Sequence, residues 1–494
     1  MKKKVYTVLI AALTLLVLGC EDFLDRKPLG RYTTETYPTG GLTQFIYGMY
    51  SDLRLYGVHA WPYVGVVSIR SDDADKGSTP TDGAQSQAPY DDFTLLPNHG
   101  LTLTFYRDNY RAINKCNVVL QQSDSLRSEI SEEEYNMARA EARFVRGYLY
   151  FNLVRAFGGV PKVDDLITDS DNFNVPRASK EEIYTLIEQD LLYAAGILPP
   201  TWGAAFIGRP TRGSAQGLLA KVYLYQQRWA ESLQMSQNVI ASGFYNLNTP
   251  YNVIFTEAGE NTSESVFEIQ AIRNESYNFG IEYVVGQGIR GTGAMDLGWG
   301  FNSPSVQLVN AYESGDPRQD HTILFQGEVT PYGEIVPPLD GVPNVRYNQK
   351  VYTNPTYRAA AGSRFGHWMN VRILRYADVL LMAAEAANEL NQTSNALDYL
   401  EQVRARARGG NASVLPQITE TNQALLRDHI RHERRIELAM EHERFFDIVR
   451  WGIAETVLHA AGKTNFVVGK HELLPIPQEE IDRSDGVLIQ NPGY

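Results

Sequence analysis

Two stretches of the chain share one helical pattern, and this repeat constrains the fold more than any other feature of the sequence. In residues 213–242, a helix predicted to end near Tyr225 is followed by a short turn and a second helix that begins near Trp229. In residues 371–408, a helix predicted to end near Leu390 is followed by another helix in the same way. Units of this kind bury their apolar faces by stacking on one another. The repeat therefore favours a helical solenoid of tetratricopeptide type over an unrelated bundle.

A third helix pair is predicted between residues 131 and 195, and each of its helices begins with a capping box. Ser131 is followed by Glu134, and Ser179 by Glu182. This spacing lets a hydroxyl and a carboxylate satisfy the unpaired backbone N–H groups of a first helical turn. Apolar residues then recur at intervals of three and four. The sequence thus predicts a mostly α fold built on a tetratricopeptide-like scaffold.

Two long regions interrupt the helical pattern. Residues 57–104 and 245–365 are rich in Gly, Pro, Asn, Asp and aromatic residues, with short strand-like runs such as Ser265–Ile269. Long irregular segments in a compact protein are usually functional or disordered, and the aromatic content argues against disorder. We expect these loops, with a few short strands, to carry the function.

The first twenty residues predict a lipoprotein signal. Lysines at positions 2 to 4 precede the apolar run 5–18, and Gly19 precedes Cys20. About 14 apolar residues are fewer than the roughly 20 that a membrane-spanning helix needs. We expect cleavage of residues 1–19 and a lipid anchor on Cys20, which leaves 20–494 as one tethered domain. The alternative is an ordinary signal peptide that happens to contain a cysteine.

Charge and cysteine content exclude several classes of function. The formal net charge is -13 and no basic stripe stands out, so nucleic acid is not an expected partner. The chain has two cysteines, and Cys116 is alone if Cys20 is lipidated. Neither a disulfide framework nor a thiolate metal cluster can then be built.

Three motifs resemble cofactor or metal sites and fall short of them. Residues 286–291 match G-x-G-x-x-G, but the glycines that follow forbid the helix that a dinucleotide site requires. Residues 72–77 resemble the start of a calcium loop, yet Ala84 stands where the bidentate Glu belongs; a looser structural calcium site stays an alternative. The histidines and acids of 429–442 alternate with arginines, which favours ion pairs over metal ligands. We therefore expect no catalytic residues, no metal ligands and no other cofactor.

Several segments resemble the SusD/RagB family. The carboxyl-terminal segments 431–452 (RHERRIELAMEHERFFDIVRWG) and 473–494 (LLPIPQEEIDRSDGVLIQNPGY) are similar to that family's signatures. Further landmarks are Cys20–Asp25, Arg143–Tyr148, Phe157–Pro161 and Tyr376–Leu381. Two departures are Phe105, where the family often has Trp, and residues 483–485, which replace an Asn-Pro pair. The resemblance spans essentially the whole mature chain.

The resemblance implies an outer-membrane lipoprotein that faces the medium. It implies four tetratricopeptide-like helix pairs, with irregular loops forming the ligand surface. Such proteins cap a TonB-dependent, SusC-like transporter, help to deliver an oligosaccharide or polysaccharide, and are not enzymes. A peptide-capture protein of the same fold is an alternative. A surface glycosidase is a second alternative, because two suitably spaced carboxylates can hide among 58 acidic residues.

The loop regions hold residues suited to a sugar. A pyranose ring has an apolar face that stacks on flat aromatics and a hydroxyl edge that hydrogen-bonds to charged or amide groups. We expect only about a third of the candidates to contact ligand, since loop aromatics often serve packing. The candidates are Trp61, Tyr63, Arg70, Asp72, Asp73, Lys76 and Tyr90 from the first region, and Tyr283 and Trp299 from the second.

Overall fold

The computed structural model describes residues 41–167, 174–338 and 344–494 of the chain. The predicted signal peptide and Cys20 lie outside these residues, so the lipid anchor stays a prediction. In the described part most secondary structure is helical, and its strands form four two-stranded sheets. The predicted fold class, mostly α with a few short strands, is confirmed.

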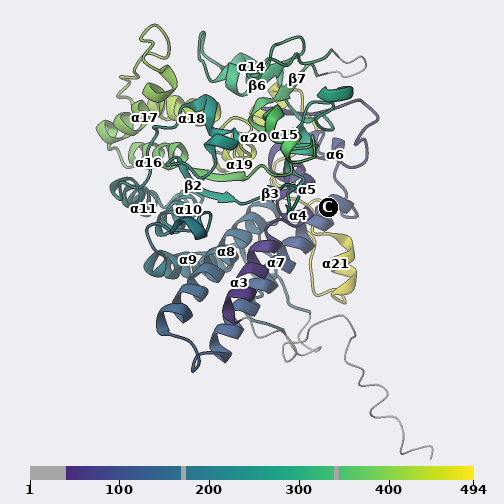
Figure 1. Ribbon diagram of the computed structural model, residues 1–494, viewed down its shortest axis with the longest axis vertical. Coiled ribbons are helices and arrows are strands. Elements are labelled where there is room, and N and C mark those ends of the chain that lie inside the picture. The colour runs from purple at the N-terminus through teal and green to yellow at the C-terminus, as the bar shows by residue number, and fades with distance from the viewer. Residues whose placement is uncertain (1–40, 168–173, 339–343) are drawn as a thin grey trace, which may run out of the picture. The chain divides into compact units, whose positions relative to one another are not determined.

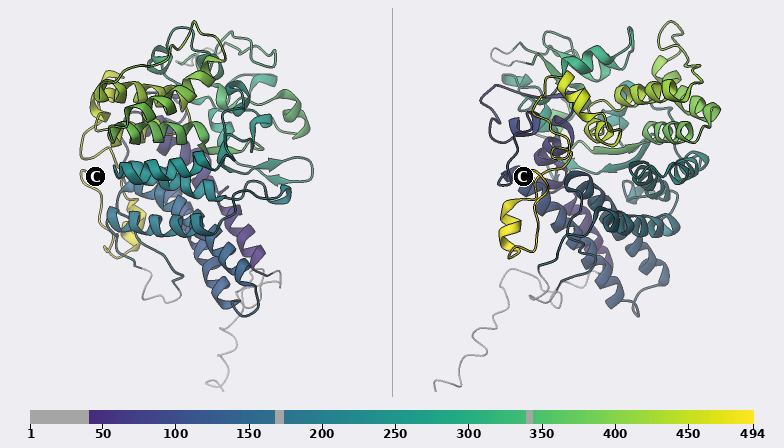
Figure 2. Two further views of the ribbon diagram at one scale, coloured as in Figure 1. Left: turned by 90° about the vertical axis from the view of Figure 1, so that its left-hand side faces the viewer. Right: turned by 180° about the vertical axis from the view of Figure 1, so that it is seen from behind.

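Four helix pairs form the scaffold, as expected. Each helix packs on the next one in chain order, and α11 packs on α16 across the long region 242–375. Figure 2 shows the pairs in layers, from purple and blue through teal to green. The pairs are α3 (Leu42–Asp52) with α7 (Gly100–Ser125), α8 (Glu132–Phe157) with α9 (Lys180–Ile197), α10 (Arg212–Tyr225) with α11 (Trp229–Ala241), and α16 (Tyr376–Glu389) with α17 (Thr393–Arg408).

Capping residues fix the starts of α8 and α9. Ser179 accepts a hydrogen bond from the backbone N–H of Glu182, whose carboxylate accepts one from the Ser179 N–H in return. At α8, Ser131 accepts from the backbone N–H of Glu134, which is the first of the two bonds of the predicted box. Both predicted helix starts are therefore confirmed.

One predicted helix is shorter than expected. Residues 371–375 form strand β8 (Val371–Arg375), and α16 begins only at Tyr376. Strand β8 pairs antiparallel with β2 (Ser265–Ile269), the strand expected from sequence. This sheet lies against α10, where Gly217 leaves space for the Leu374 side chain, whose Cδ2 is 2.7 Å from the position a Cβ would take. Tertiary packing overrides the helical pattern of 371–375.

The two loop regions contain more short helices than predicted. Helix α14 begins at Val306, with Ser305 as its cap. The G-x-G-x-x-G segment 286–291 is followed by a 3-10 turn and not by the α-helix whose N-terminus a dinucleotide site requires. The first region contains α4 (Tyr56–His59), α5 (Trp61–Val64), η1 (Gly65–Ile69), β1 (Ala74–Gly77) and α6 (Ala88–Asp91). The second contains α12 (Tyr251–Ile254), η4 (Glu257–Gly259), β3 (Ile272–Arg273), β4 (Asn278–Phe279), α13 (Tyr283–Gln287), η5 (Gly293–Met295), β5 (Phe301–Pro304), α14 (Val306–Ala311), η6 (Gln319–His321), β6 (Ile323–Phe325), β7 (Arg346–Asn348), η7 (Gln349–Val351) and α15 (Pro355–Ala360).

Buried ion pairs join the carboxyl-terminal helices to the scaffold. In α18 (Gln423–Glu437), the fully buried Arg434 contacts Asp378 of α16 at 2.5 Å and Asp447 of α19 (Arg444–Arg450) at 3.0 Å. The same helix pairs Glu437 with arginines of β8 and α17. The predicted structural role of these charges is confirmed, but these partners lie on other elements and not along one helix. The remaining helices of the described residues are η3 (Ala204–Phe206), α20 (Ala454–Ala460) and α21 (Gln478–Arg483).

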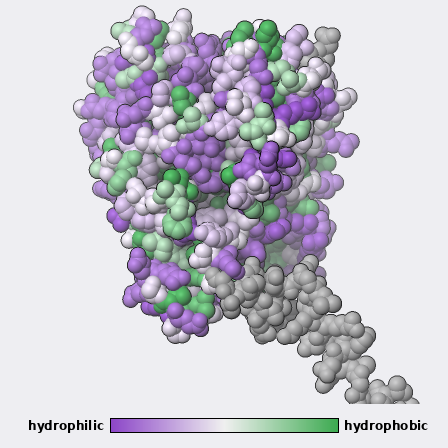
Figure 3. Space-filling model, viewed as in Figure 1, coloured by the Kyte–Doolittle hydropathy of each residue, from purple (hydrophilic) through white to green (hydrophobic). Residues whose placement is uncertain are grey.

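The surface of the described residues is mixed in polarity. On the face shown in Figure 3, apolar residues are scattered among polar ones. None of the helices in the described ranges is long and apolar enough to cross a membrane. The remaining cysteine, Cys116, is buried in α7 without a disulfide partner.

Candidate functional site

The two loop regions meet at a short antiparallel ladder. Strand β1 pairs with β5 in the register Ala74 with Pro304 and Gly77 with Phe301. The backbone N–H of Ser78 extends the contact by donating to the Gly300 carbonyl at 2.7 Å. Segments more than two hundred residues apart in sequence are therefore paired directly; Figure 1 labels α4, α5 and α6 of the first region and α14 and α15 of the second.

Trp299 presents an exposed indole next to this ladder. Its side chain is 37% exposed, whereas Trp61 beneath it is only 5% exposed. The two rings meet edge to face, and Trp61 also packs on Phe301 with centroids 4.6 Å apart. The Trp299 backbone N–H donates to the Val285 carbonyl at 2.8 Å, which fixes the loop. A flat, supported aromatic of this kind can stack on the apolar face of a sugar ring.

Polar side chains lie next to the two residues that follow Trp299: a Cβ at Gly300 would lie 2.8 Å from the Arg290 Cβ, and the Lys76 ammonium lies over the Phe301 ring. Arg290 contacts the Asp82 carboxylate at 2.5 Å, and each of the two side chains is about one third exposed. Hydrogen bonds from Thr79 and Ser78, together with the Arg290 charge, hold the pKa of Asp82 below its usual value. Lys76 donates to the carbonyls of Thr79 and Asp82, both at 2.8 Å. The loop therefore offers an ionised acceptor and a guanidinium donor for hydroxyl groups.

Sequence reasoning missed Asp82 and Arg290. Both lie in the predicted loop regions, but neither stands in a recognisable motif. The ion pair that joins them forms across 208 positions and is visible only in three dimensions. The signal that could have found them is the presence of opposite charges in both aromatic-rich regions.

Three charged candidates are corrected to structural roles. Asp72 and Asp73 are 3% and 1% exposed, and their carboxylates contact Arg444 and Arg435 at 2.8 and 2.6 Å. Burial raises the pKa of Asp73, while Arg444 and Arg435 overcome burial and lower the pKa of Asp72. Arg70 is 1% exposed and lies over the Phe445 ring at 3.9 Å. In this structure these three side chains are too deeply buried for a ligand to contact them.

Residues 72–77 do not form the loop that the calcium-site alternative requires. Ala74–Gly77 forms strand β1, and the Asp72 and Asp73 carboxylates point to guanidinium groups. In the described ranges, no group of three or more His, Cys, Asp or Glu side chains is arranged to hold a metal ion.

The other aromatic candidates pack beneath the loops. Tyr90 is fully buried, with its hydroxyl 2.9 Å from that of Thr102. Tyr63 is 5% exposed and its ring lies edge-on to His442. The partly buried Tyr283 places its hydroxyl 2.5 Å from Nε2 of the same histidine, whose pKa burial lowers to about 3. Tyr63 and Tyr90, like Trp61, are therefore corrected to supporting roles; Trp299 is the exposed candidate, and Lys76 and Tyr283 are partly buried.

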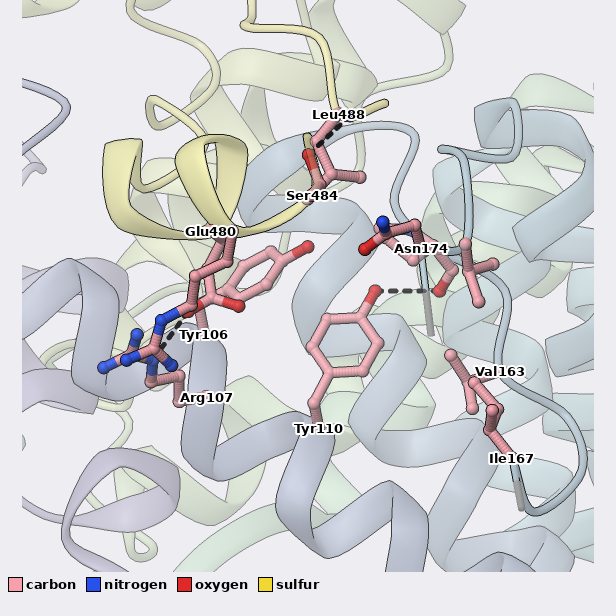
Figure 4. Close-up of a pocket in the computed structure, with 12 residues that line it drawn as sticks. Tyr106, Arg107, Tyr110, Val163, Ile167, Asn174, Glu480, Ser484 and Leu488 are labelled. Carbon is pink, nitrogen blue, oxygen red and sulfur yellow. Dashed lines mark hydrogen bonds and ion pairs between the residues drawn. The ribbon is translucent and has the colours of Figure 1, made fainter. Parts of the chain in front are cut away.

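A separate cavity lies away from the loop surface. Figure 4 shows it between α7, residues of 161–167 and 174–175, and α21. It encloses about 340 Å³. Tyr110 donates to the Pro161 carbonyl at 2.8 Å, and Arg107 contacts Glu480 at 2.6 Å at its edge. None of its lining residues comes from the two loop regions.

Comparison with known proteins places the chain in a family. The profile described as "SusD family" matches residues 263–494, and the profile described as "Starch-binding associating with outer membrane" matches residues 22–224. SusD-like protein P2 of Formosa agariphila is 30% identical over 520 aligned positions, covering 100% of both chains. A SusD-like protein of Bacteroides ovatus is 28% identical, covering 91% of this chain and 83% of the relative.

Solved structures agree with this assignment. A protein described as "Laminarin binding SusD-like protein" superposes with a TM-score of 0.77 at 29% identity, covering 92% of this chain and 99% of that one. A surface glycan-binding protein A from Bacteroides thetaiotaomicron, in complex with laminarihexaose, superposes with a TM-score of 0.75 at 24% identity, covering 91% and 98%; at that identity the likeness concerns the fold. The chain belongs to the SusD family.

Proposed function

We propose that this protein is a cell-surface glycan-binding lipoprotein. It captures neutral oligosaccharides or polysaccharides on the loop surface and passes them to a SusC-like TonB-dependent transporter. The observation that carries the proposal is the exposed indole of Trp299, supported edge to face by Trp61. The Asp82–Arg290 pair supplies the hydrogen-bonding groups for the edge of the sugar.

The first ligand to test is a β-glucan of the laminarin type. The solved relative named for laminarin binding is 29% identical over nearly its whole length. Starch is the second, because one matching profile is described as starch-binding. Both are neutral, in keeping with a site where one carboxylate and one guanidinium balance each other.

The protein is proposed to bind without catalysis. Glycoside hydrolysis needs two carboxylates on opposite sides of the scissile bond, about 5 to 10 Å apart. Glu257 and Glu260, whose carboxylates line the cavity between β3 and α15, lie three positions apart at one short turn. This arrangement favours binding over hydrolysis, with the glycosidase as the alternative that product analysis addresses.

The anchor and the partner are part of the proposal. The amino-terminal profile is described as associating with the outer membrane, and Cys20 follows a predicted signal peptide. Membrane fractionation of Cys20→Ala tests the anchor, since release of a folded protein is expected. Retention of that variant in carbonate-washed membranes would contradict the lipoprotein proposal. Co-purification with a TonB-dependent transporter from the native membrane tests the partner.

A single panel separates the three candidate functions. The purified mature domain is titrated by calorimetry with laminarin, starch, other neutral polysaccharides and a peptide digest, and each mixture is assayed for new reducing ends. Glycan binding without reducing ends is expected. Peptide binding alone would favour the peptide-capture alternative, and new reducing ends would favour the glycosidase.

A further inference from the structure

A second groove opens on the loop side between strand β3 and helix α15. It encloses about 420 Å³, which is enough for more than one sugar ring. Trp368, only 6% exposed, lies at its floor with Glu257 and Glu260 of the η4 turn. This groove shares no lining residue with the Trp299 surface.

Each of the two carboxyl groups at the floor, Glu257 and Glu260, accepts hydrogen bonds from the protein through only one of its oxygens. Glu257 Oε1 accepts hydrogen bonds from Trp368 Nε1 and from the Asn354 backbone N–H, both at 3.1 Å. Glu260 Oε1 accepts from the Asn370 backbone N–H at 2.8 Å and from Arg372 at 3.4 Å. Their Oε2 atoms have no hydrogen-bond partner among the described residues. Each carboxyl group is therefore fixed in place with one oxygen left to hydrogen-bond to a ligand hydroxyl.

The walls of the groove supply apolar contact. Tyr357 of α15 is 49% exposed, and its hydroxyl has no hydrogen-bond partner within the described part of the chain. Ala360 and Ala361 next to it are small, so the wall is open. On the opposite side, Ile272 is 46% exposed. An exposed aromatic ring lining the same groove as fixed carboxyl groups is the combination that a neutral sugar needs.

One segment connects this groove to the Trp299 loop. After α15 the chain reaches Arg364, which contacts Asp296 at 2.7 Å and the Gly293 carbonyl at 3.4 Å. Two residues before the floor residue Trp368, Gly366 packs on Val284 of α13. Residues 361–368 thus border the groove and touch the loop that carries Trp299, which places both features on the loop-rich side.

We propose that the groove between β3 and α15 is a second subsite for a neutral glycan, so that a long chain contacts the protein there and at Trp299. This inference rests on the proposed glycan-binding function. Two linked contacts raise the affinity for a polysaccharide far more than for a short oligosaccharide, because the second contact forms within the complex. The protein therefore selects long chains over short ones.

Filling the groove tests the proposal without removing any native contact. Ala360 and Ala359 are neighbouring exposed residues of α15, but only Ala360 lines the groove. Ala360→Trp is expected to weaken laminarin binding about tenfold, and Tyr357→Ala by a similar factor, the scale of a lost aromatic contact. Ala359→Trp is the matched control, and Tyr47→Ala controls for loss of an exposed tyrosine on another helix.

The readout is calorimetry with laminarin and with laminaritriose for each variant, with melting temperature as the folding check. We expect trisaccharide affinity to fall in Trp299→Ala and to stay unchanged in Ala360→Trp. If both groove variants bound laminarin like the wild type while Trp299→Ala lost affinity, the second subsite would be wrong and the proposed function would stand. If the wild type bound no glycan of the panel, the proposed function itself would be wrong, and the subsite with it.

Discussion

The ring centroids of Trp61 and Trp299 lie 5.8 Å apart with their planes at 80°, so a buried indole supports an exposed one edge to face. Gly286 also packs against Trp61, where a Cβ would come within 2.5 Å of the ring. The buried Trp61 indole is therefore packed against the backbone of Gly286, where there is no space for another side chain. Two tryptophans equally prominent in the sequence thus have different roles, and this difference can be measured.

Alanine substitution should separate the two roles. Trp299→Ala is expected to weaken glycan binding by about 1 to 3 kcal/mol, or five- to a hundredfold, with little change in melting temperature. Trp61→Ala leaves a cavity and should lower the free energy of unfolding by about 3 to 5 kcal/mol. Calorimetry and chemical denaturation of both variants give the two quantities. Equal effects of the two variants on both would contradict the assigned roles.

Two aspartates of the same loop region should respond in opposite ways. Asp72→Asn leaves the buried Arg444 without its full counter-charge and is expected to destabilise the fold by about 3 to 5 kcal/mol. Asp82→Asn changes a partly exposed pair, which contributes about 0 to 1 kcal/mol to stability, but it removes the proposed hydroxyl acceptor. Denaturation and glycan titration of both variants are the measurements. If Asp72→Asn kept its stability but bound glycan weakly, Asp72 would have to be assigned to the ligand site and not to a structural ion pair.

The sequence predicted the scaffold well and the binding surface poorly, for a physical reason. Helix periodicity and caps such as Ser179 are local signals, so they can be read from neighbouring positions. The burial of Asp73 depends on Arg435, 362 positions away, and no local pattern carries that information. Loop aromatics are equally ambiguous, because Tyr90 in the core and Trp299 on the surface have similar Gly-, Pro- and Asp-rich surroundings.

The stability of the groove floor should depend on pH through Glu260. Burial raises the pKa of Glu260 from 4.5 to about 7, although Arg372 opposes the shift. The folded state then holds this proton more tightly than the unfolded state, so this group's contribution to stability falls as pH rises from about 4.5 to 7. At about 1.4 kcal/mol per unit, the full effect is on the order of 3 kcal/mol.

Glu260→Gln is expected to remove this dependence and to stabilise the protein relative to wild type at pH 8 more than at pH 5. Arg372 keeps carbonyl partners at Ile254 and Thr256 in the variant. Urea denaturation at both pH values provides the comparison, with Glu275→Gln on the neighbouring hairpin as the control. Parallel pH profiles for wild type and Glu260→Gln would show that Glu260 does not titrate in this range.

The ladder that joins the two loop regions depends on Gly77. Its φ is +72°, and a Cβ there would lie 2.4 Å from the Gly300 carbonyl oxygen, the acceptor that also binds Ser78. Gly77→Ala should therefore push β1 away from β5, lowering both stability and glycan affinity because Trp299 directly precedes Gly300 in the chain. Gly333→Ala is the matched control, since Gly333 has a φ of +82° but open space around its Cβ position. The control bears only the left-handed backbone cost of about 1 to 2 kcal/mol.

The loss of unfolding free energy in Gly77→Ala should exceed that of Gly333→Ala, and only Gly77→Ala should lose affinity in calorimetry. Equal losses in the two variants would mean that the ladder does not hold the binding surface together.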